Sequence, residues 1–96
     1  MLHLIFQSPI ETAVLERTEA GDVLVFLENA TLRILQNGTL ADSLTGKLAT
    51  HRLCVLAEDL VIRGISPDAL IKGIEVIDYA GLVDLTVKHP LIQSWS

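Results

Sequence analysis

The chain alternates short runs of apolar residues with segments that carry helix signals. Each run is bounded by turn or capping residues, and the four runs are Leu2–Phe6, Val23–Leu27, Leu53–Leu56 and Ile74–Ile77. The second and third are apolar at every position, which is typical of strands that are covered on both faces of a parallel sheet. We therefore expect each of the four runs to form a strand.

Capping residues and glycines mark the helices between these runs. Ser8, Pro9 and Glu11 form a capping box with proline at the first helical position, and this helix is expected to end near Gly21. Two further short helices are expected, one over Ala57–Arg63 closed by Gly64, and one that starts at Ser66-Pro67-Asp68 and ends at Gly73.

The segment between the second and third runs allows two predictions. The Asn37-Gly38 dipeptide could form the turn of a β-hairpin, with Thr31–Leu35 as one arm. We prefer a helical turn over Ala30–Leu35, followed by a loop and a helix over Leu40–Leu48. Strands that alternate with helices then predict an α/β fold, a single three-layer domain over residues 1–96 with a mostly parallel sheet flanked by helices.

The end of the chain carries a further helix and an apolar tail. Asp78 is a good N-cap, and Pro90 should stop the helix because it disfavours the α conformation of the preceding residue. Within this helix, the spacing of the apolar side chains predicts one common face for Leu82, Val83 and Val87.

The tail is the best candidate for a partner interface, over His89, Leu91, Ile92 and Trp95. Trp95 could anchor a partner, since tryptophan is enriched at interface hot spots, or could fold back over its own sheet. His89 could serve as a cation at the helix end or as an interface contact.

Composition and charge limit the kind of protein. Half of the 96 residues are apolar, which is a high fraction for so small a protein. A domain of this length buries only about two-thirds of its unfolded surface. We therefore expect some apolar residues to be buried against a partner, in an oligomer or hetero-complex. The formal charge of −5 argues against direct nucleic-acid binding. The apolar runs are too short to span a membrane, and the start MLHLIF lacks a basic leader. A single cysteine fits a reducing compartment, so we expect a cytoplasmic protein.

Few residues could carry chemistry. Cys54 lies inside a predicted central strand, where apolar burial would keep its thiol inert, and Arg52 shares its face of that strand. His3, His51 and His89 are widely separated and lack the spacing of metal ligands, so no metal site and no cofactor is expected. His3 is interpreted as a satisfied, half-buried side chain, and Glu58 and Asp59 as carboxylates that suit the first turn of a helix.

Three motifs in the same order resemble one family. They are MLHxxxxSP at residues 1–9, EDLxxRG at residues 58–64 and IDYAGLVDLTVKHPxxQSW at residues 77–95. Together they closely resemble the TusB/DsrH family of sulfur-relay subunits, within the DsrE-like superfamily, and the likeness runs over the whole chain. The resemblance implies the same parallel α/β fold.

The resemblance also implies a function. Members of the TusB type assemble with two homologous sisters, TusC and TusD, as a heterohexamer that passes persulfide sulfur toward 2-thiolation of the wobble uridine in transfer RNA. The active cysteine of the sulfur-carrying sister lies where the third strand passes into the next helix, which corresponds to about Leu56 here. This chain is therefore expected to be a non-catalytic subunit.

Three other interpretations stay open. The chain could be a DsrH-like subunit of a sulfur-oxidation complex, although some members of that type carry a cysteine in the first helix and Ile10–Ala20 has none. It could be a thiol transferase that uses Cys54. It could also be a stand-alone α/β interaction domain.

Overall fold

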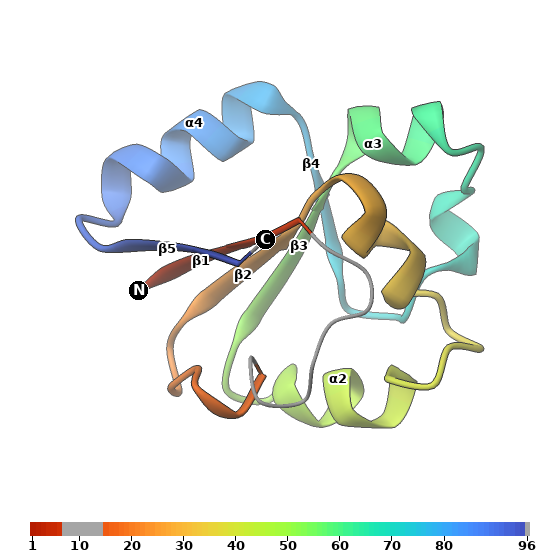
Figure 1. The fold of residues 1–96 in the computed structure, drawn as a ribbon, viewed down its shortest axis with the longest axis horizontal. Coiled ribbons are helices and arrows are strands. Elements are labelled where there is room, and N and C mark those ends of the chain that lie inside the picture. Colours follow the sequence, from red (N-terminus) through yellow and green to blue (C-terminus); the bar gives the residue numbers. More distant parts are fainter. Residues whose placement is uncertain (7–14, 96) are drawn as a thin grey trace.

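The described part of the computed structural model, residues 1–6 and 15–95, forms a five-stranded sheet in which every strand is parallel to its neighbours (Figure 1). The strand order is β4-β3-β2-β1-β5. The strands are β1 (Leu2–Ile5), β2 (Val23–Phe26), β3 (Arg52–Leu56), β4 (Glu75–Ile77) and β5 (Ile92–Trp95). The first four confirm the predicted strands, each to within one residue at either end.

Short helices connect the strands. They are the 3-10 helix η1 (Glu28–Arg33), α2 (Ala41–Lys47), α3 (Ala57–Ile62), the 3-10 turn η2 (Pro67–Ala69) and α4 (Tyr79–Lys88). None of the helices in residues 1–6 and 15–95 is long and apolar enough to cross a membrane. The predicted capping box at Ser8, Pro9 and Glu11 lies outside the described residues.

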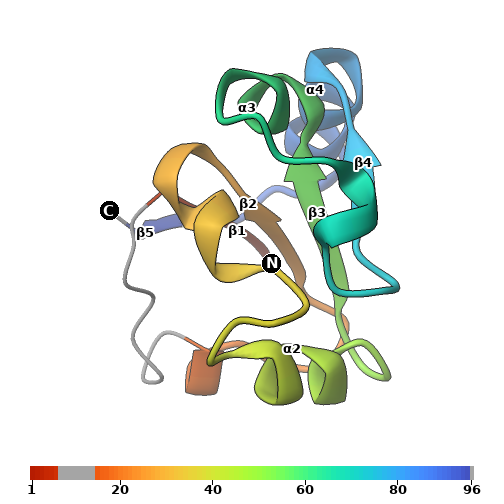
Figure 2. The same ribbon diagram turned by 90° about the vertical axis from the view of Figure 1, so that its right-hand side faces the viewer.

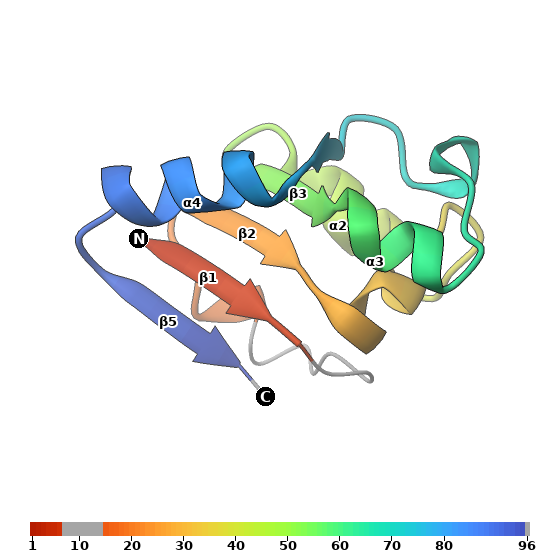
Figure 3. The same ribbon diagram turned by 90° about the horizontal axis from the view of Figure 1, so that it is seen from above.

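The sheet is covered on both faces, which confirms the three-layer fold (Figures 2 and 3). On one face, side chains of η1, α2 and α3 pack on alternate residues of the central strands, and this cluster includes Leu24, Phe26, Leu53, Val55, Ala30, Ile34, Leu44 and Leu60. On the other face, α4 packs on the intervening residues, a cluster that includes Leu2, Val23, Val25, Cys54, Leu56 and Leu85. Because β2 and residues Leu53–Leu56 of β3 are buried on both faces, these stretches are continuously apolar.

The helices of the middle segment are confirmed, and the alternative hairpin at Asn37-Gly38 is not formed. Two predicted helix ends are wrong. The first helix has its last helical residue at Glu16 rather than near Gly21, and the helix expected to reach Gly73 is a single 3-10 turn that ends at Ala69.

Local pairing explains why the chain becomes extended after η2. Leu70 forms an antiparallel bridge with Leu35, and the Ile71 amide donates to the Ile34 carbonyl over 3.0 Å. Both Leu70 and Ile71 are buried in the core. These tertiary contacts prevail over the helix that Ser66-Pro67-Asp68 begins, although Ser66 does cap the turn by accepting from the Asp68 amide.

The start of α4 is as predicted, but its buried face is not. Asp78 is the N-cap and accepts a hydrogen bond of 2.8 Å from the Gly81 amide. Leu82 and Leu85 face the sheet, whereas Val83 and Val87 are 57% and 79% exposed. The predicted common face was therefore wrong, because apolar residues surround this helix and the sheet covers only one side of it.

The tail forms a strand that the sequence did not predict. β5 pairs with β1 in parallel, with Ile92 opposite Leu2 and Trp95 opposite Ile5. This register places Trp95 on the core face, where its indole Nε1 donates to His3 Nδ1 over 3.0 Å. Trp95 thus folds back on its own sheet. Leu91 and Ile92 stay 62% and 45% exposed, and the partner interface predicted for the tail stays a prediction.

Substitutions of Trp95 measure this packing. Trp95→Ala is expected to lower the free energy of unfolding by about 2–3 kcal/mol, less than for a fully buried ring. Trp95→Phe keeps an aromatic ring, although a smaller one, and loses the hydrogen bond to His3, and should cost about 1 kcal/mol. Urea unfolding followed by circular dichroism measures both, with the exposed Val87→Ala as control. Equal stability of Trp95→Ala and Val87→Ala would contradict this packing.

Candidate functional site

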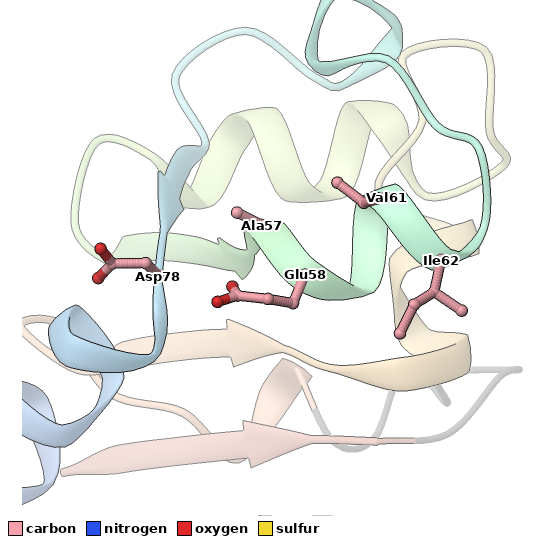
Figure 4. Close-up of a pocket in the computed structure, with 5 residues that line it drawn as sticks. All are labelled: Ala57, Glu58, Val61, Ile62 and Asp78. Carbon is pink, nitrogen blue, oxygen red and sulfur yellow. The ribbon is translucent and has the colours of Figure 1, made fainter.

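The carboxyl ends of β3 and β4 meet at one edge of the sheet. In open α/β sheets, ligands bind outside the carboxyl ends of the strands. β3 leads directly into α3, and β4 leads into α4 through Asp78. Between them lies a shallow pocket of about 500 Å³, lined by Ala57, Glu58, Val61, Ile62 and Asp78 (Figure 4).

The pocket combines apolar walls with carboxylates. Val61 and Ile62 are 79% and 75% exposed at its rim. Glu58 extends from the first turn of α3 toward the connection that carries Asp78 (Figure 4), and its Oε1 atom is buried without a hydrogen-bond partner among the described residues. The Asp78 carboxylate accepts a hydrogen bond from the Gly81 amide at the N-terminus of α4. None of the five lining side chains is a nucleophile of the cysteine, serine or threonine type.

Cys54 lies within β3 and does not reach this pocket. Its side chain is fully buried under α4, as predicted, and burial raises the pKa of the Cys54 thiol to about 12 from its ordinary value of 9.0. Burial outweighs Arg52 on the same face, which lowers that pKa, and Glu75, whose Oε2 pairs with Arg52 Nε over 2.7 Å, raises it. The Cys54 Sγ atom lies 3.7 Å from the same Glu75 oxygen. A protonated, enclosed thiol of this kind is inert toward sulfur transfer.

The central motif, EDLxxRG, has a structural role that the helix-dipole interpretation missed. Asp59 is buried, and its Oδ2 accepts a hydrogen bond of 2.7 Å from the Glu28 amide at the end of β2. Arg63 lies 3.6 Å from Asp59 Oδ1 and also donates to Asn29 Oδ1 over 3.1 Å. Glu28 has a left-handed backbone with φ of 50°. Asp59 therefore holds this strained turn against α3. The four-residue spacing of Asp59 and Arg63 places both side chains on one helix face, and it was the signal in the sequence for their ion pair.

The amino-terminal motif also supports the fold. His3 is buried, and its Nε2 atom lies 2.8 Å from Asp22 Oδ2. Since the Trp95 indole can only donate to Nδ1, Nε2 carries the proton and donates to Asp22. Asp22 also accepts from the Met1 ammonium and the Glu19 amide, each over 2.9 Å. Burial alone would raise the pKa of Asp22, but these three donors outweigh it and hold that pKa well below its ordinary value of 3.8.

The remaining histidines lie apart. Each ring nitrogen of His51 lies within hydrogen-bond distance of a hydroxyl. Nε2 is 3.0 Å from Thr18 Oγ1, and Nδ1 is 2.8 Å from Thr50 Oγ1. Burial, together with Lys47, lowers the pKa of His51. His89 follows α4, and its amide donates to the last turn of that helix. Within the part of the chain that the structure describes, no group of three or more His, Cys, Asp or Glu side chains could hold a metal ion.

Comparison with known proteins places this fold in a family. The family described as DsrH like protein matches residues 6–91. Protein TusB of Buchnera aphidicola subsp. Baizongia pistaciae is 33% identical over 98 residues, which cover 99% of this chain and 100% of its own length. Protein TusB of Escherichia coli strain K12 is 34% identical over the same shares of both chains. The chain belongs to the DsrH-like family.

Two solved structures share the fold at low sequence identity. The protein of unknown function MTH1491 from Methanobacterium thermoautotrophicum superposes with a TM-score of 0.79 at 11% identity, over 98% of this chain and 96% of its own. The ychN protein of Escherichia coli superposes with a TM-score of 0.76 at 14% identity, over 98% and 97%. These likenesses confirm the predicted fold class.

The reactivity of the thiol provides a direct test of its burial. At neutral pH, a pKa near 12 leaves Cys54 with roughly a thousandth of the thiolate of a free cysteine. We expect an aromatic disulfide reagent to modify the folded chain very slowly and the unfolded chain rapidly. A Ser43→Cys, Cys54→Ala variant, which moves the thiol to the exposed face of α2, should react rapidly in both states. Rapid labelling of folded wild type would contradict an inert thiol.

The Asp22 cluster predicts a pH dependence of stability. Because folding lowers the pKa of Asp22, its ionised form stabilises the fold fully above the unfolded value of 3.8, and this contribution is lost progressively as the pH falls below that value toward the folded-state pKa. Asp22→Asn should cost about 2 kcal/mol at neutral pH, and the cost should shrink below about pH 4. Urea unfolding at several pH values measures the difference, with the exposed Asp42→Asn as control. A cost that is independent of pH would contradict this role.

Proposed function

We propose that the chain is a non-catalytic subunit of a cytoplasmic sulfur-relay complex of the TusBCD type. In that complex it joins two homologous sisters, TusC-like and TusD-like, in a heterohexamer. The complex passes persulfide sulfur along a series of thiols toward the 2-thio group of the wobble uridine in transfer RNA. The persulfide is held by the thiol of a sister, and this subunit supplies shape and contacts.

One observation carries the proposal. The chain matches proteins named TusB over their whole length, yet the junction of β3 and α3 reads Leu56-Ala57-Glu58. By the family resemblance, the sulfur-carrying sister has its active cysteine at this junction. Persulfide transfer requires a thiolate that another sulfur can reach. The buried thiol of Cys54 supports a role without sulfur chemistry of its own.

The negative charge of the chain supports its place in the relay. A formal charge of −5 disfavours binding to RNA, whose phosphates are neutralised by basic side chains. A subunit upstream of the RNA-modifying enzyme needs only protein partners. The absence of direct nucleic-acid binding therefore belongs to the same proposal.

A DsrH-like subunit of a sulfur-oxidation complex is the second candidate, because the matching family carries the DsrH name. The two candidates share the assembly and differ in the product. Deletion of the gene would abolish 2-thiouridine in transfer RNA in the first case. In the second case it would leave that nucleoside intact and impair the oxidation of reduced sulfur compounds.

The experiment is an affinity purification of the tagged chain from its source cells, followed by complementation of the deletion strain. We expect two small homologous proteins to copurify, one of them with a cysteine at its own β3–α3 junction. We also expect Cys54→Ala to restore 2-thiouridine to the level that the wild-type gene restores.

The outcomes separate the possible roles. Copurification without any effect of Cys54→Ala supports a non-catalytic subunit. Loss of 2-thiouridine in Cys54→Ala, in a variant that still folds and assembles, would assign the chemistry to this chain. Recovery of neither sister, with a monomeric chain on a sizing column, would contradict the relay role.

A further inference from the structure

The C-terminal strand β5 is attached to the sheet through one partly buried side chain. β5 forms an edge of the sheet and pairs with β1 alone. The side chains of Ile92, Gln93 and Ser94 are exposed, and Trp95 is the one residue of β5 that packs on the core. The docking of β5 therefore depends on its backbone hydrogen bonds with β1 and on the contacts of Trp95.

The hydrogen bond of Trp95 requires an uncharged His3. The indole Nε1 can only donate, and it donates to His3 Nδ1 over 3.0 Å. Nδ1 accepts this bond only while it carries no proton, and the other ring nitrogen already donates to Asp22 over 2.8 Å. A second proton on the ring would set two N–H groups against each other at this contact. Protonation of His3 and docking of Trp95 therefore oppose each other.

The surroundings let His3 become charged while the rest of the sheet stays in place. The charged ring keeps Asp22 as its partner, and a hydrogen bond between two ionised groups is stronger than one from a neutral ring. On the neighbouring strands, Leu24 of β2 and Gln93 of β5 lie opposite His3, and neither side chain titrates. The cost of the added proton therefore falls on the contact with Trp95.

Other charged groups near this contact do not decide whether Trp95 is held. The Met1 ammonium is paired with the carboxylate that is bonded to His3, and the Arg17 guanidinium lies over the Trp95 ring, 5.9 Å from its centroid. Both already carry their positive charge, which a fall in pH does not change. His51 also interacts electrostatically with His3, but burial lowers the pKa of His51, so it takes up its proton at a lower pH than an ordinary histidine.

We propose that β5 is a pH-sensitive latch, in which proton uptake by His3 undocks Trp95 and loosens β5 from β1. The neutral ring holds the strand, whereas the charged ring keeps Asp22 and releases the indole. Loosening of β5 leaves the outer backbone groups of β1 unpaired at the edge of the sheet. The latch uses contacts within this chain alone, so it stands or falls independently of the proposed function.

Amide hydrogen exchange of the purified chain, followed residue by residue by nuclear magnetic resonance, tests the latch between about pH 7.5 and about pH 5. Asp22 stays ionised over this range, because its pKa lies well below 3.8. The reporter amides are those of Leu2 and Phe6, which donate to the Leu91 and Trp95 carbonyls, each over 3.0 Å. Each rate is divided by that of the unfolded chain at the same pH, and the amides of β2 and β3 report global unfolding.

We expect the corrected exchange of both reporter amides to rise about tenfold at the acidic end, as for the loss of one hydrogen bond, while the amides of β2 and β3 keep their protection. The indole proton of Trp95 and the ring protons of His3 should change their signals at the same pH. His3→Gln should abolish the rise, because its amide can accept from the indole without titrating. Trp95→Phe, which lacks the indole donor, should abolish the rise as well and serves if His3→Gln does not fold.

His51→Gln and His89→Gln are the matched controls, because each removes a titrating ring other than His3, and both should keep the tenfold rise. Three results would overturn the latch. In the first, His3 becomes protonated while exchange of the reporter amides is unchanged. In the second, the rise persists in Trp95→Phe or is abolished by one of the two controls. In the third, the amides of β2 and β3 lose protection to the same extent, so that acid acts through global unfolding.

Discussion

A buried chain of hydrogen bonds through His3 holds the two ends of the molecule in one sheet. The Trp95 indole donates to one ring nitrogen over 3.0 Å, and the other nitrogen donates to Asp22 over 2.8 Å. A histidine that is 2% exposed is tolerated only because both nitrogens have partners. The chain of bonds joins β5 to β1 and to the turn that leads into β2, so it fixes the edge at which the sheet ends.

The carboxyl ends of the inner strands β2 and β3 depend on a second buried acid. Where β2 and β3 end, Asp59 accepts a hydrogen bond from the Glu28 amide and forms an ion pair with Arg63. This contact positions α3, and with it the surface formed by Glu58, Val61 and Ile62. The two acids of the EDL motif therefore differ in role, although they are adjacent in sequence. Asp59 is buried and bonded within the molecule, while Glu58 lines the pocket and its Oε1 atom has no donor in the part of the chain that the structure describes.

The family chemistry and the local chemistry of this chain fit together on physical grounds. Burial raises the pKa of the Cys54 thiol to about 12, so the single thiol of the chain contributes to core packing and not to chemistry. The pocket at the carboxyl edge carries carboxylates and apolar side chains in place of a nucleophile. A surface of this kind suits recognition of a neighbouring protein, which agrees with the proposed role of a subunit without sulfur chemistry of its own.

Local patterns were sufficient for the four central strands, for the Asp78 cap and for the burial of Cys54, because each depends on neighbours in sequence. They were insufficient for β5, for the extended chain at Leu70 and for the buried face of α4. The tail became a strand because β1 offered a free edge and a core position for Trp95. The pairing of Leu70 with Leu35, and the cover of only one side of α4, likewise follow from where distant segments lie. The different roles of Glu58 and Asp59 depended on the same long-range geometry, since the spacing of Asp59 and Arg63 indicates their pair but not the bond from Asp59 to the distant Glu28 amide.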